Sequence, residues 1–247
     1  MKGLLESAIS GRNMRTSHAH VVDQIGRAII SGELAIGDTL PGDAELEARF
    51  QVSRTVLREA MKTLSAKGLI VPKARIGTKV TDRSRWNLLD ADILVWHLEK
   101  GIDEPFLTHL SEIRLAIEPM AAGLAATRAT PEDIARLRKL GEEMGSADHT
   151  AETLAVADLK FHLAIAEASK NPFMLSVSTL IEAALVTVFR LSSPAANPEH
   201  IAAGAISHLK IVDAIERRDV EAARKAMEGV ILYGVERVLA AVIEPST

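Results

Sequence analysis

Residues 40–80 constrain the fold of this chain more than any other segment, because they combine two short amphipathic helices with a basic hairpin. A tight turn near Val52 ends the first predicted helix, and the second follows at once and carries Arg54 and Arg58. Residues four apart project from the same face of a helix, so both guanidinium groups should point the same way. Gly68 is suited to end this helix, and strand-forming residues follow it. The segment therefore predicts a winged helix-turn-helix.

The polar side chains of this segment suit contact with DNA. A pair of arginines on an exposed helix can bind guanine bidentately in the major groove. Hydroxyl groups beside them can cap the helix and contact phosphate, and phosphate also attracts the cations of the hairpin. A merely solvated face explains most arginine pairs, but not the apolar inner faces and the basic hairpin that accompany this one. The predicted DNA-contacting residues are Ser53, Arg54, Thr55, Arg58, Lys73, Arg75 and Lys79.

The two parts of the chain carry opposite net charge. Residues 1–85 hold 14 Lys and Arg against 9 Asp and Glu, whereas the remainder holds 15 against 24. DNA binding needs only a local basic surface, so the overall charge of −4 does not argue against it. The acidic remainder should face away from the duplex.

From residue 105 onward the apolar periodicity is helical throughout, which predicts an all-α bundle and a chain that is mainly α. Helices are expected at 105–128, 131–145, 150–169, 172–191, 198–217 and 219–243, with Pro131 and Pro172 at first-turn positions. A length of 247 residues suits two domains. The predicted organisation is a flexible leader at 1–17, a winged helix-turn-helix domain at 18–82, a linker and connecting helix at 83–104, and an all-helical effector-binding and dimerisation domain at 105–243.

The composition excludes several classes of protein. Without cysteine there can be no disulfide and no Cys-based zinc site. No apolar run approaches the length of a membrane span, and the first residues lack the order of a signal peptide. We therefore expect a cytoplasmic protein with no membrane partner.

A second candidate site lies in the predicted bundle. Asp158 and His162 are one turn apart in an apolar helix, and His208 lies among apolar neighbours in a later one. One carboxylate and two imidazoles can bind a divalent metal such as Zn²⁺, Ni²⁺ or Mn²⁺, with water or a small acid completing the coordination. From the spacing alone, a simple hydrogen bond between Asp158 and His162 is the commoner explanation.

Taken together, these segments resemble the GntR family of bacterial transcription regulators, in its FadR-type branch with an FCD ligand-binding domain. The resemblance runs from about residue 18 to 240. Its motifs are LPGDAEL at 40–46, VSRTVLREAM at 52–61, SEIRLAIEPMAAGLAA at 111–126, DLKFH at 158–162, NP at 171–172 and HLKIVDAIERRDVEAARKAM at 208–227. The segment RWNLLDADILVWHLE at 85–99 is similar to a subgroup of galactonate-responsive repressors.

In the DNA-binding part, the resemblance implies base-reading roles for Arg54 and Arg58 and a phosphate or base contact for Thr55. The family often has an arginine where this chain has Ala44, so one usual DNA contact is missing. At the tip of the wing the family commonly has a glycine or histidine, and Arg75 of this chain can substitute there through contact with phosphate or the minor groove.

In the helical part, the resemblance implies that Asp158, His162 and His208 are three of the family's metal ligands. Val230 stands where a fourth ligand, a histidine, is usual. Valine cannot bind a metal, which leaves two possibilities. Either three protein ligands hold the ion with water and effector completing its coordination, or the effector binds without metal.

The same resemblance implies an arginine for the effector's carboxylate, and Arg114 is at that position. An ion pair of Arg114 with Glu118 or Glu112 is the alternative, and Arg190 is a second candidate for the carboxylate. The predicted effector-binding residues are Arg114, Asp158, His162, Arg190 and His208.

These observations predict a DNA-binding transcription regulator, a repressor of a carbohydrate-acid catabolic operon. It would bind a palindromic operator as a homodimer and leave it when a small carboxylate such as a sugar acid binds. One alternative is a metal-dependent enzyme domain fused to a DNA-binding head, although no nucleophile motif or phosphate loop supports it. Another is an effector-independent DNA-binding protein, because Val230 weakens the metal site.

Overall fold

The structure is a computed structural model that describes residues 16–101 and 104–243. These residues form two compact units, an N-terminal unit up to residue 101 and a C-terminal unit from residue 104. Most of the predicted leader, residues 1–15, lies outside the described residues. None of the described helices is long and apolar enough to cross a membrane.

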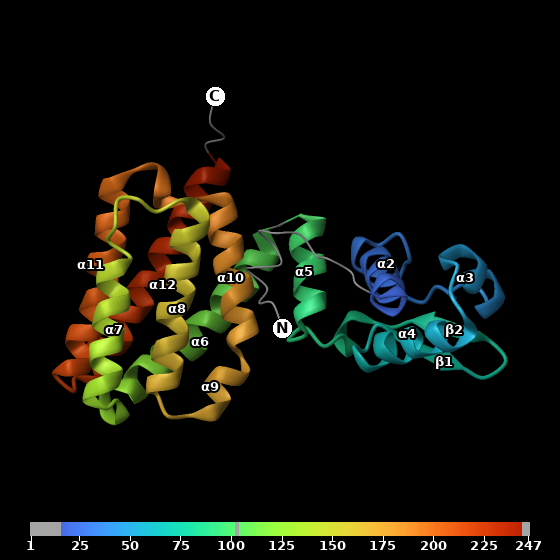
Figure 1. Cartoon of the computed structure of the whole chain (residues 1–247), viewed down its shortest axis with the longest axis horizontal. Helices are drawn as coiled ribbons and strands as arrows, with labels where there is room; N and C mark the ends of the chain where they lie inside the picture. The colour runs from blue at the N-terminus through green and yellow to red at the C-terminus, as the bar shows by residue number, and fades with distance from the viewer. Residues whose placement is uncertain (1–15, 102–103, 244–247) are drawn as a thin grey trace. The chain divides into compact units, whose positions relative to one another are not determined.

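The N-terminal unit is a winged helix-turn-helix, as predicted (Figure 1). Helix α2 packs against α4 and α5, and α3 packs against α4. Its antiparallel strands pair Ile70 with Val80 and Lys73 with Gly77, which leaves a three-residue turn at the tip of the wing. The elements are α2 (Ser17–Ser31), α3 (Asp43–Phe50), α4 (Arg54–Ala66), β1 (Ile70–Lys73), β2 (Gly77–Val80), η1 (Arg83–Arg85) and α5 (Ala91–Lys100).

Local chemistry fixes both ends of α4. The Ser53 hydroxyl accepts a hydrogen bond from the Val56 amide at 3.4 Å and caps the start. Gly68 follows the last turn with a φ of +80°, and a Cβ there would lie 1.9 Å from the Arg85 carbonyl oxygen. Only glycine combines this left-handed backbone with so close an approach. Both ends of α4 are therefore fixed by residues directly before and after it.

Helix α5, which the sequence assigns to a connecting segment, packs into the core of the N-terminal unit. Trp96 is only 2% exposed, and its indole N–H donates to Asp23 Oδ1 at 2.9 Å. Its ring covers Gly26 so closely that a Cβ on Gly26 would lie 2.3 Å from it. The hydrogen bond satisfies a buried indole and a buried carboxylate together. Helix α5 is thereby held on α2.

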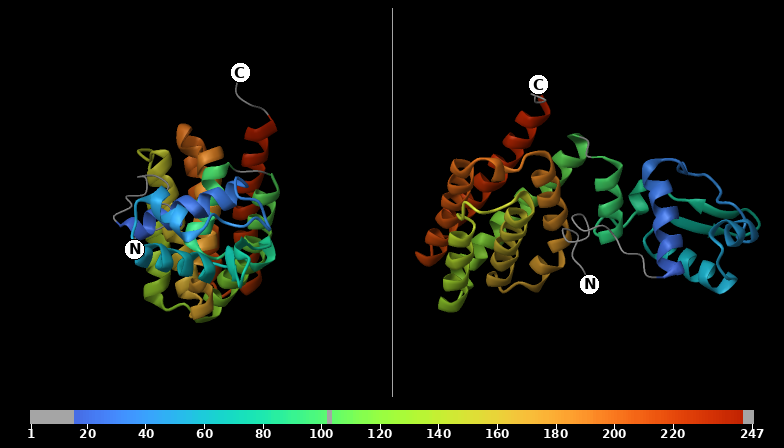
Figure 2. Two further views of the ribbon diagram at one scale, coloured as in Figure 1. Left: turned by 90° about the vertical axis from the view of Figure 1, so that its right-hand side faces the viewer. Right: turned by 45° about the horizontal axis from the view of Figure 1, so that its top comes forward.

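The C-terminal unit is an all-α bundle, as predicted (Figures 1 and 2). Helix α6 packs along α12 and α8, α11 packs on α12 and α7, and α8 also packs on α7 and α10. The elements are α6 (Glu104–Arg128), α7 (Pro131–Glu143), α8 (Ala151–Ala168), α9 (Pro172–Ser176), α10 (Ser178–Leu191), η2 (Pro194–Ala196), α11 (Pro198–Glu216) and α12 (Val220–Ile243).

Capping residues explain where these helices begin. Thr130 and Asp133 form a capping box around Pro131, and Asn171 caps a helix that starts at Pro172. Both start signals are confirmed. The helix expected at 172–191 is instead two helices, because the backbone leaves helical geometry at Val177, with a φ of −98° and a ψ of 7°.

Candidate functional site

The predicted DNA-contacting residues of α4 lie on an exposed face at its start. The side chains of Arg54, Thr55 and Arg58 are exposed, and Ser53 caps the helix directly before them. Leu57 and Leu64 occupy the opposite face and are buried in the core. The amphipathic pattern therefore leaves the guanidinium groups available to a ligand.

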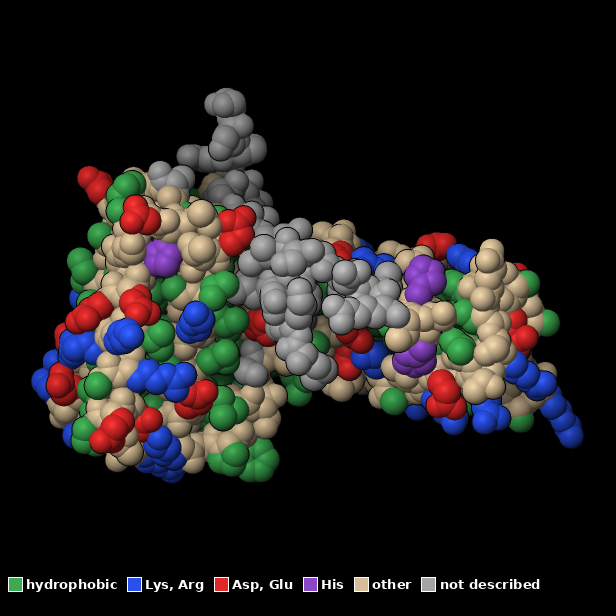
Figure 3. Space-filling model, in the orientation of Figure 1, with side chains coloured by type: hydrophobic (Ala, Val, Ile, Leu, Met, Phe, Trp, Pro, Cys, Tyr) green, Lys and Arg blue, Asp and Glu red, His purple; other side chains and the backbone are tan. Residues whose placement is uncertain are grey.

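The wing adds further cations beside a short sheet. Lys73 ends β1, and Arg75 occupies the turn with a φ of +64°; both are exposed. Lys79 is only half-buried, because it pairs with Val71 in the sheet and forms a bridge with Thr39. Lys and Arg side chains gather at this end of the unit in Figure 3.

A cluster of buried polar residues lies inside the C-terminal unit. Asp158 and His162 come from α8 and His208 from α11, and each is at most 6% exposed. Asp158 Oδ1 lies 3.1 Å from His208 Nε2, and Asp158 Oδ2 lies 3.7 Å from His162 Nε2. One potential ligand atom from each residue falls within 4.8 Å of the other two. The structure thus brings together the three residues that the sequence predicts as metal ligands.

The outer nitrogen of each imidazole is held by an acceptor. His208 Nδ1 hydrogen-bonds the Gly204 carbonyl at 2.8 Å, and His162 Nδ1 is in close contact with Glu118 Oε2. When both Nδ1 atoms donate, both neutral rings turn an Nε2 lone pair toward Asp158. Those two nitrogens are buried and have no hydrogen-bond partner among the described residues. A carboxylate facing two lone pairs needs a cation between them, either a proton or a metal ion.

Electrostatics keep both buried carboxyl groups ionised. Burial alone would raise the pKa of Glu118, but the positive charge of Arg114 and the contact with His162 outweigh it and hold the pKa at about 2. Burial opposes ionisation of Asp158 as well, and His162 and His208 bring its pKa to about 2. The pKa of His208 is raised despite burial, because the carboxylate of Asp158 lies beside its Nε2 and favours the charged ring.

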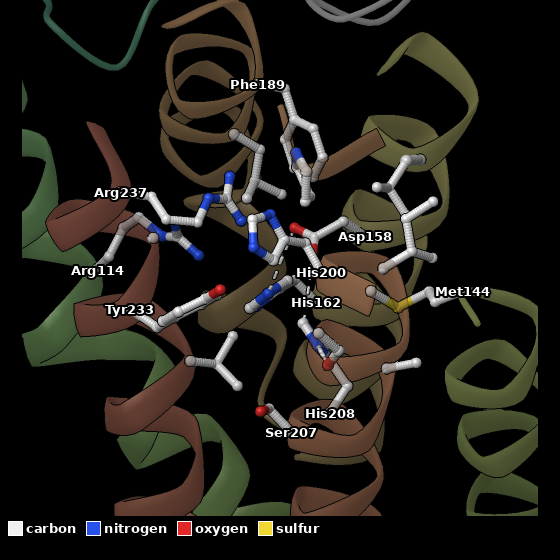
Figure 4. Close-up of a pocket in the computed structure, with 18 residues that line it drawn as sticks. Arg114, Met144, Asp158, His162, Phe189, His200, Ser207, His208, Tyr233 and Arg237 are labelled. Atoms are coloured by element: carbon white, nitrogen blue, oxygen red, sulfur yellow. Dashed lines mark hydrogen bonds and ion pairs between the residues drawn. The ribbon is translucent and has the colours of Figure 1, made fainter. Parts of the chain in front are cut away.

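The cluster opens into a cavity of about 50 Å³ between α6, α8, α10, α11 and α12, room for a few water molecules. Figure 4 shows Arg114, Tyr233 and Arg237 entering from one side and Met144 from the other, with Asp158 and the histidines between them. Val230 also lines it. The other lining residues are Leu154, Leu185, Phe189, Pro194, His200, Ile201, Gly204, Ala205, Ser207 and Gly234.

The structure places the two predicted arginines differently. Arg114 lines the cavity, and it donates from Nε to Glu118 Oε1 at 2.5 Å, which is the ion pair given as the alternative interpretation. Arg190 belongs to α10, but its side chain lies outside the described residues.

Sequence reasoning missed three residues of this site. Glu118 was considered only as a partner of Arg114, although it also contacts His162 from another helix. His200 is an exposed residue of α11 that also lines the cavity, and it was not among the predicted site residues. Arg237 was not considered, and its place one turn after Tyr233 in an apolar helix is the signal that was available.

The fold and its exposed basic helix define a DNA-binding transcription regulator with a sensor-like helical unit. Residues 18–80 match the model of bacterial regulatory proteins of the gntR family, and residues 109–232 match the FCD domain. The chain belongs to the GntR family and carries an FCD domain.

Similar proteins agree with this assignment. The HTH-type transcriptional regulator YieP of Escherichia coli K12 is 36% identical, over 85% of this chain and 90% of that protein. The galactonate operon transcriptional repressor of the same organism is 33% identical, over 88% of this chain and 95% of that protein. The solved structure of Lar, which controls the expression of the agr system of Listeria monocytogenes, shares the fold, with a TM-score of 0.62 and 19% identity over 93% of this chain and 99% of that chain. The chain is therefore a regulator and not an enzyme.

Proposed function

We propose that this protein is a repressor that binds a palindromic operator as a homodimer and is released by a small hydroxy carboxylate, with sugar acids as the favoured class. The observation that carries the sensor part is the convergence on Asp158, in a cavity, of two buried imidazole nitrogens that form no hydrogen bond among the described residues. The similarity to a galactonate operon repressor supports the choice of effector class.

For the operator, we propose that Arg54 and Arg58 contact base edges while Ser53 and Thr55 contact phosphate. The exposure of these side chains at the start of a well-capped helix supports this assignment. The wing cations Lys73, Arg75 and Lys79 would add phosphate contacts. In a homodimer, two such helices would enter successive major grooves about 34 Å apart.

For the sensor, we propose that Asp158, His162 and His208 hold a divalent ion such as Zn²⁺, Ni²⁺ or Mn²⁺. The donor set of one oxygen and two nitrogens fits such an ion, and acceptors of the kind that orient metal-bound histidines lie at both outer nitrogens, with the Gly204 carbonyl hydrogen-bonded to His208 and Glu118 in close contact with His162. When bound, the ion supplies a Lewis-acidic centre for oxygen ligands. Because Val230 offers no ligand, positions remain for water or effector.

Charge balance supports an anionic effector. Two carboxylates, Asp158 and Glu118, and two guanidinium groups, Arg114 and Arg237, lie in or beside the cavity and cancel in number. With the imidazoles neutral, a divalent cation would leave an excess of positive charge in a poorly solvated site, which an acid would reduce. A neutral sugar would leave that excess in place.

The switch would operate by differential binding. We propose that an acid bound beside α6, α8, α11 and α12 favours a helix arrangement with lower operator affinity, because a ligand shifts a two-state equilibrium only by binding one state more tightly. The change would reach the N-terminal unit through residues 81–104. Such a switch requires two global states of the proposed dimer.

The test is operator release measured by fluorescence anisotropy. A labelled duplex selected from a random pool by the purified protein is titrated with full-length protein and zinc, with glycerate, threonate or galactonate added. We expect at least one acid to weaken operator binding, and to do so less in His162→Ala. His109→Ala, which removes an exposed histidine of α6, is the matched control. If no acid changes operator affinity or thermal stability, the protein is an effector-independent DNA-binding protein.

A further inference from the structure

Arg114, the arginine expected to bind the effector, already forms an ion pair with a buried carboxylate of the protein, that of Glu118. Its Nε donates to Glu118 Oε1 at 2.5 Å, and the two residues are only 5% and 3% exposed. Glu118 in turn contacts His162. Arg114 is therefore needed to neutralise a buried carboxylate that lies against a histidine. Removing one partner of such a buried ion pair strongly lowers the free energy of unfolding.

Arg237 of α12 lies in the same cavity with a different set of contacts. One of its terminal nitrogens donates to the Ser192 carbonyl, and its guanidinium lies 5.5 Å from the centre of the Tyr233 ring. Its Nε is buried without a hydrogen-bond partner, and it has no ion pair with a carboxylate, among the described residues. The Ser192 carbonyl and the Tyr233 ring carry no net charge, so most of the positive charge of Arg237 remains uncompensated.

The electrostatic surroundings agree with this geometry. Burial lowers the pKa of Arg237, and the attractions of Tyr233 and Asp158 offset this only in part. An anion beside the guanidinium would reverse the imbalance, because an arginine can donate two parallel hydrogen bonds to a carboxylate. Figure 4 shows Arg237 above Arg114 and Tyr233, at the edge of the cavity that holds Asp158.

We propose that Arg237, rather than Arg114, binds the carboxylate of the effector and makes the site selective for acids over neutral polyols. This inference rests on the proposed function and specifies which residue discriminates. The effector would span the cavity, with its carboxylate at Arg237 and its hydroxyl groups toward Asp158, His162 and His208. Arg114 would act through Glu118 as a positioning residue.

The bond to Ser192 gives Arg237 a second, structural role that the test must separate. Ser192 lies between α10 and η2, so this bond ties α12 to the segment that contributes Pro194 to the cavity. A purely structural arginine would affect acids and neutral polyols alike. A carboxylate-binding arginine would affect acids alone.

The experiment pairs each acid with the alditol that lacks its carboxylate. Calorimetric titrations of zinc-loaded, full-length protein with glycerate and glycerol, threonate and threitol, and galactonate and galactitol compare wild type with Arg237→Gln. Lys225→Gln removes an exposed cation from the same helix and is the control. Arg237→Lys retains the charge without the planar fork, and retention of the zinc-induced rise in melting temperature shows that the cavity is still folded.

We expect Arg237→Gln to weaken the acid roughly 10- to 100-fold, as for the loss of charged hydrogen bonds, and to leave the alditol unchanged. Arg237→Lys should recover part of the loss. Equal acid affinity in wild type and Arg237→Gln would overturn the inference and leave the proposed function standing, as would an equal loss for acid and alditol. If no acid binds the zinc-loaded wild type, the proposed function fails and this inference fails with it.

Discussion

Zinc should stabilise this protein through Asp158, His162 and His208, and His208→Ala should remove most of that stabilisation. A ligand that binds only the folded state at 100 times its dissociation constant adds about 2.7 kcal/mol to the free energy of unfolding. For a folded unit of 150–250 residues this corresponds to a rise of roughly 5–11 °C in melting temperature. If loss of one ligand weakens binding about 100-fold, the same zinc concentration adds only ~0.4 kcal/mol, or about 1–2 °C.

The assay is thermal unfolding at pH 7.5 with zinc or EDTA, followed by far-ultraviolet circular dichroism and by tryptophan fluorescence. The only tryptophans of the chain, Trp86 and Trp96, both lie in the N-terminal unit, so their fluorescence reports on that unit. His109→Ala should respond to zinc as wild type does, because its side chain is exposed on α6. Equal zinc responses in wild type and His208→Ala would refute the metal assignment.

Adding a metal ligand at position 230 tests the same site in the opposite direction. Val230 lines the cavity from α12, so Val230→His should offer a fourth ligand and increase the zinc-induced rise at the same metal concentration. A variant that folds, but gains nothing from zinc beyond wild type, would show that position 230 does not face the ion.

Three further results are expected. Arg54→Ala should weaken operator binding by ~1–3 kcal/mol per half-site without changing the melting temperature, as measured by anisotropy beside Lys225→Ala; an unchanged affinity would exclude base contact by this residue. In metal-free protein, the ionised Glu118 should contribute stability above its ordinary pKa of 4.5 that is lost as the pH falls toward its folded value of about 2. Denaturant titrations from pH 5 to pH 2.5 should therefore show a steeper loss for wild type than for Glu118→Gln, and parallel curves would contradict the assignment. Gly26→Ala should displace Trp96 and lower the free energy of unfolding by ~1–3 kcal/mol, seen as a lower urea midpoint; an unchanged midpoint would mean that the ring moves freely.

Local patterns in the sequence predicted most of the fold, because helix periodicity and caps are properties of neighbouring residues. The capped starts at Pro131 and Pro172 lie where the proline and its preceding residue indicated. The break at Val177 had no such signal, since neither glycine nor proline marks it. The packing of α5 on α2 depends on a contact between Asp23 and Trp96, which are 73 residues apart.

The residues of the site likewise divide into those that local patterns predict and those that depend on contacts between helices. Spacing of one helical turn paired Asp158 with His162, and the apolar neighbours of His208 in a later helix added the third residue. The contact of Glu118 with His162 joins two helices, and the place of Arg237 depends on how α12 packs against α6 and α11. No periodicity within one segment encodes such contacts. Val230 shows the opposite case, because one residue at a position where the family has a histidine already predicts that no fourth protein ligand is present.

Control of DNA binding by the effector is tested most directly by measuring the coupling between acid and DNA in both directions. Operator affinity is determined with and without saturating acid, and acid affinity is determined with and without saturating operator, in the zinc-loaded protein. Thermodynamic linkage requires the two factors to be equal, and we expect each to weaken the other by about 5- to 150-fold. A factor of one in both directions, with acid and operator each bound tightly, would show that the buried cluster does not control DNA binding.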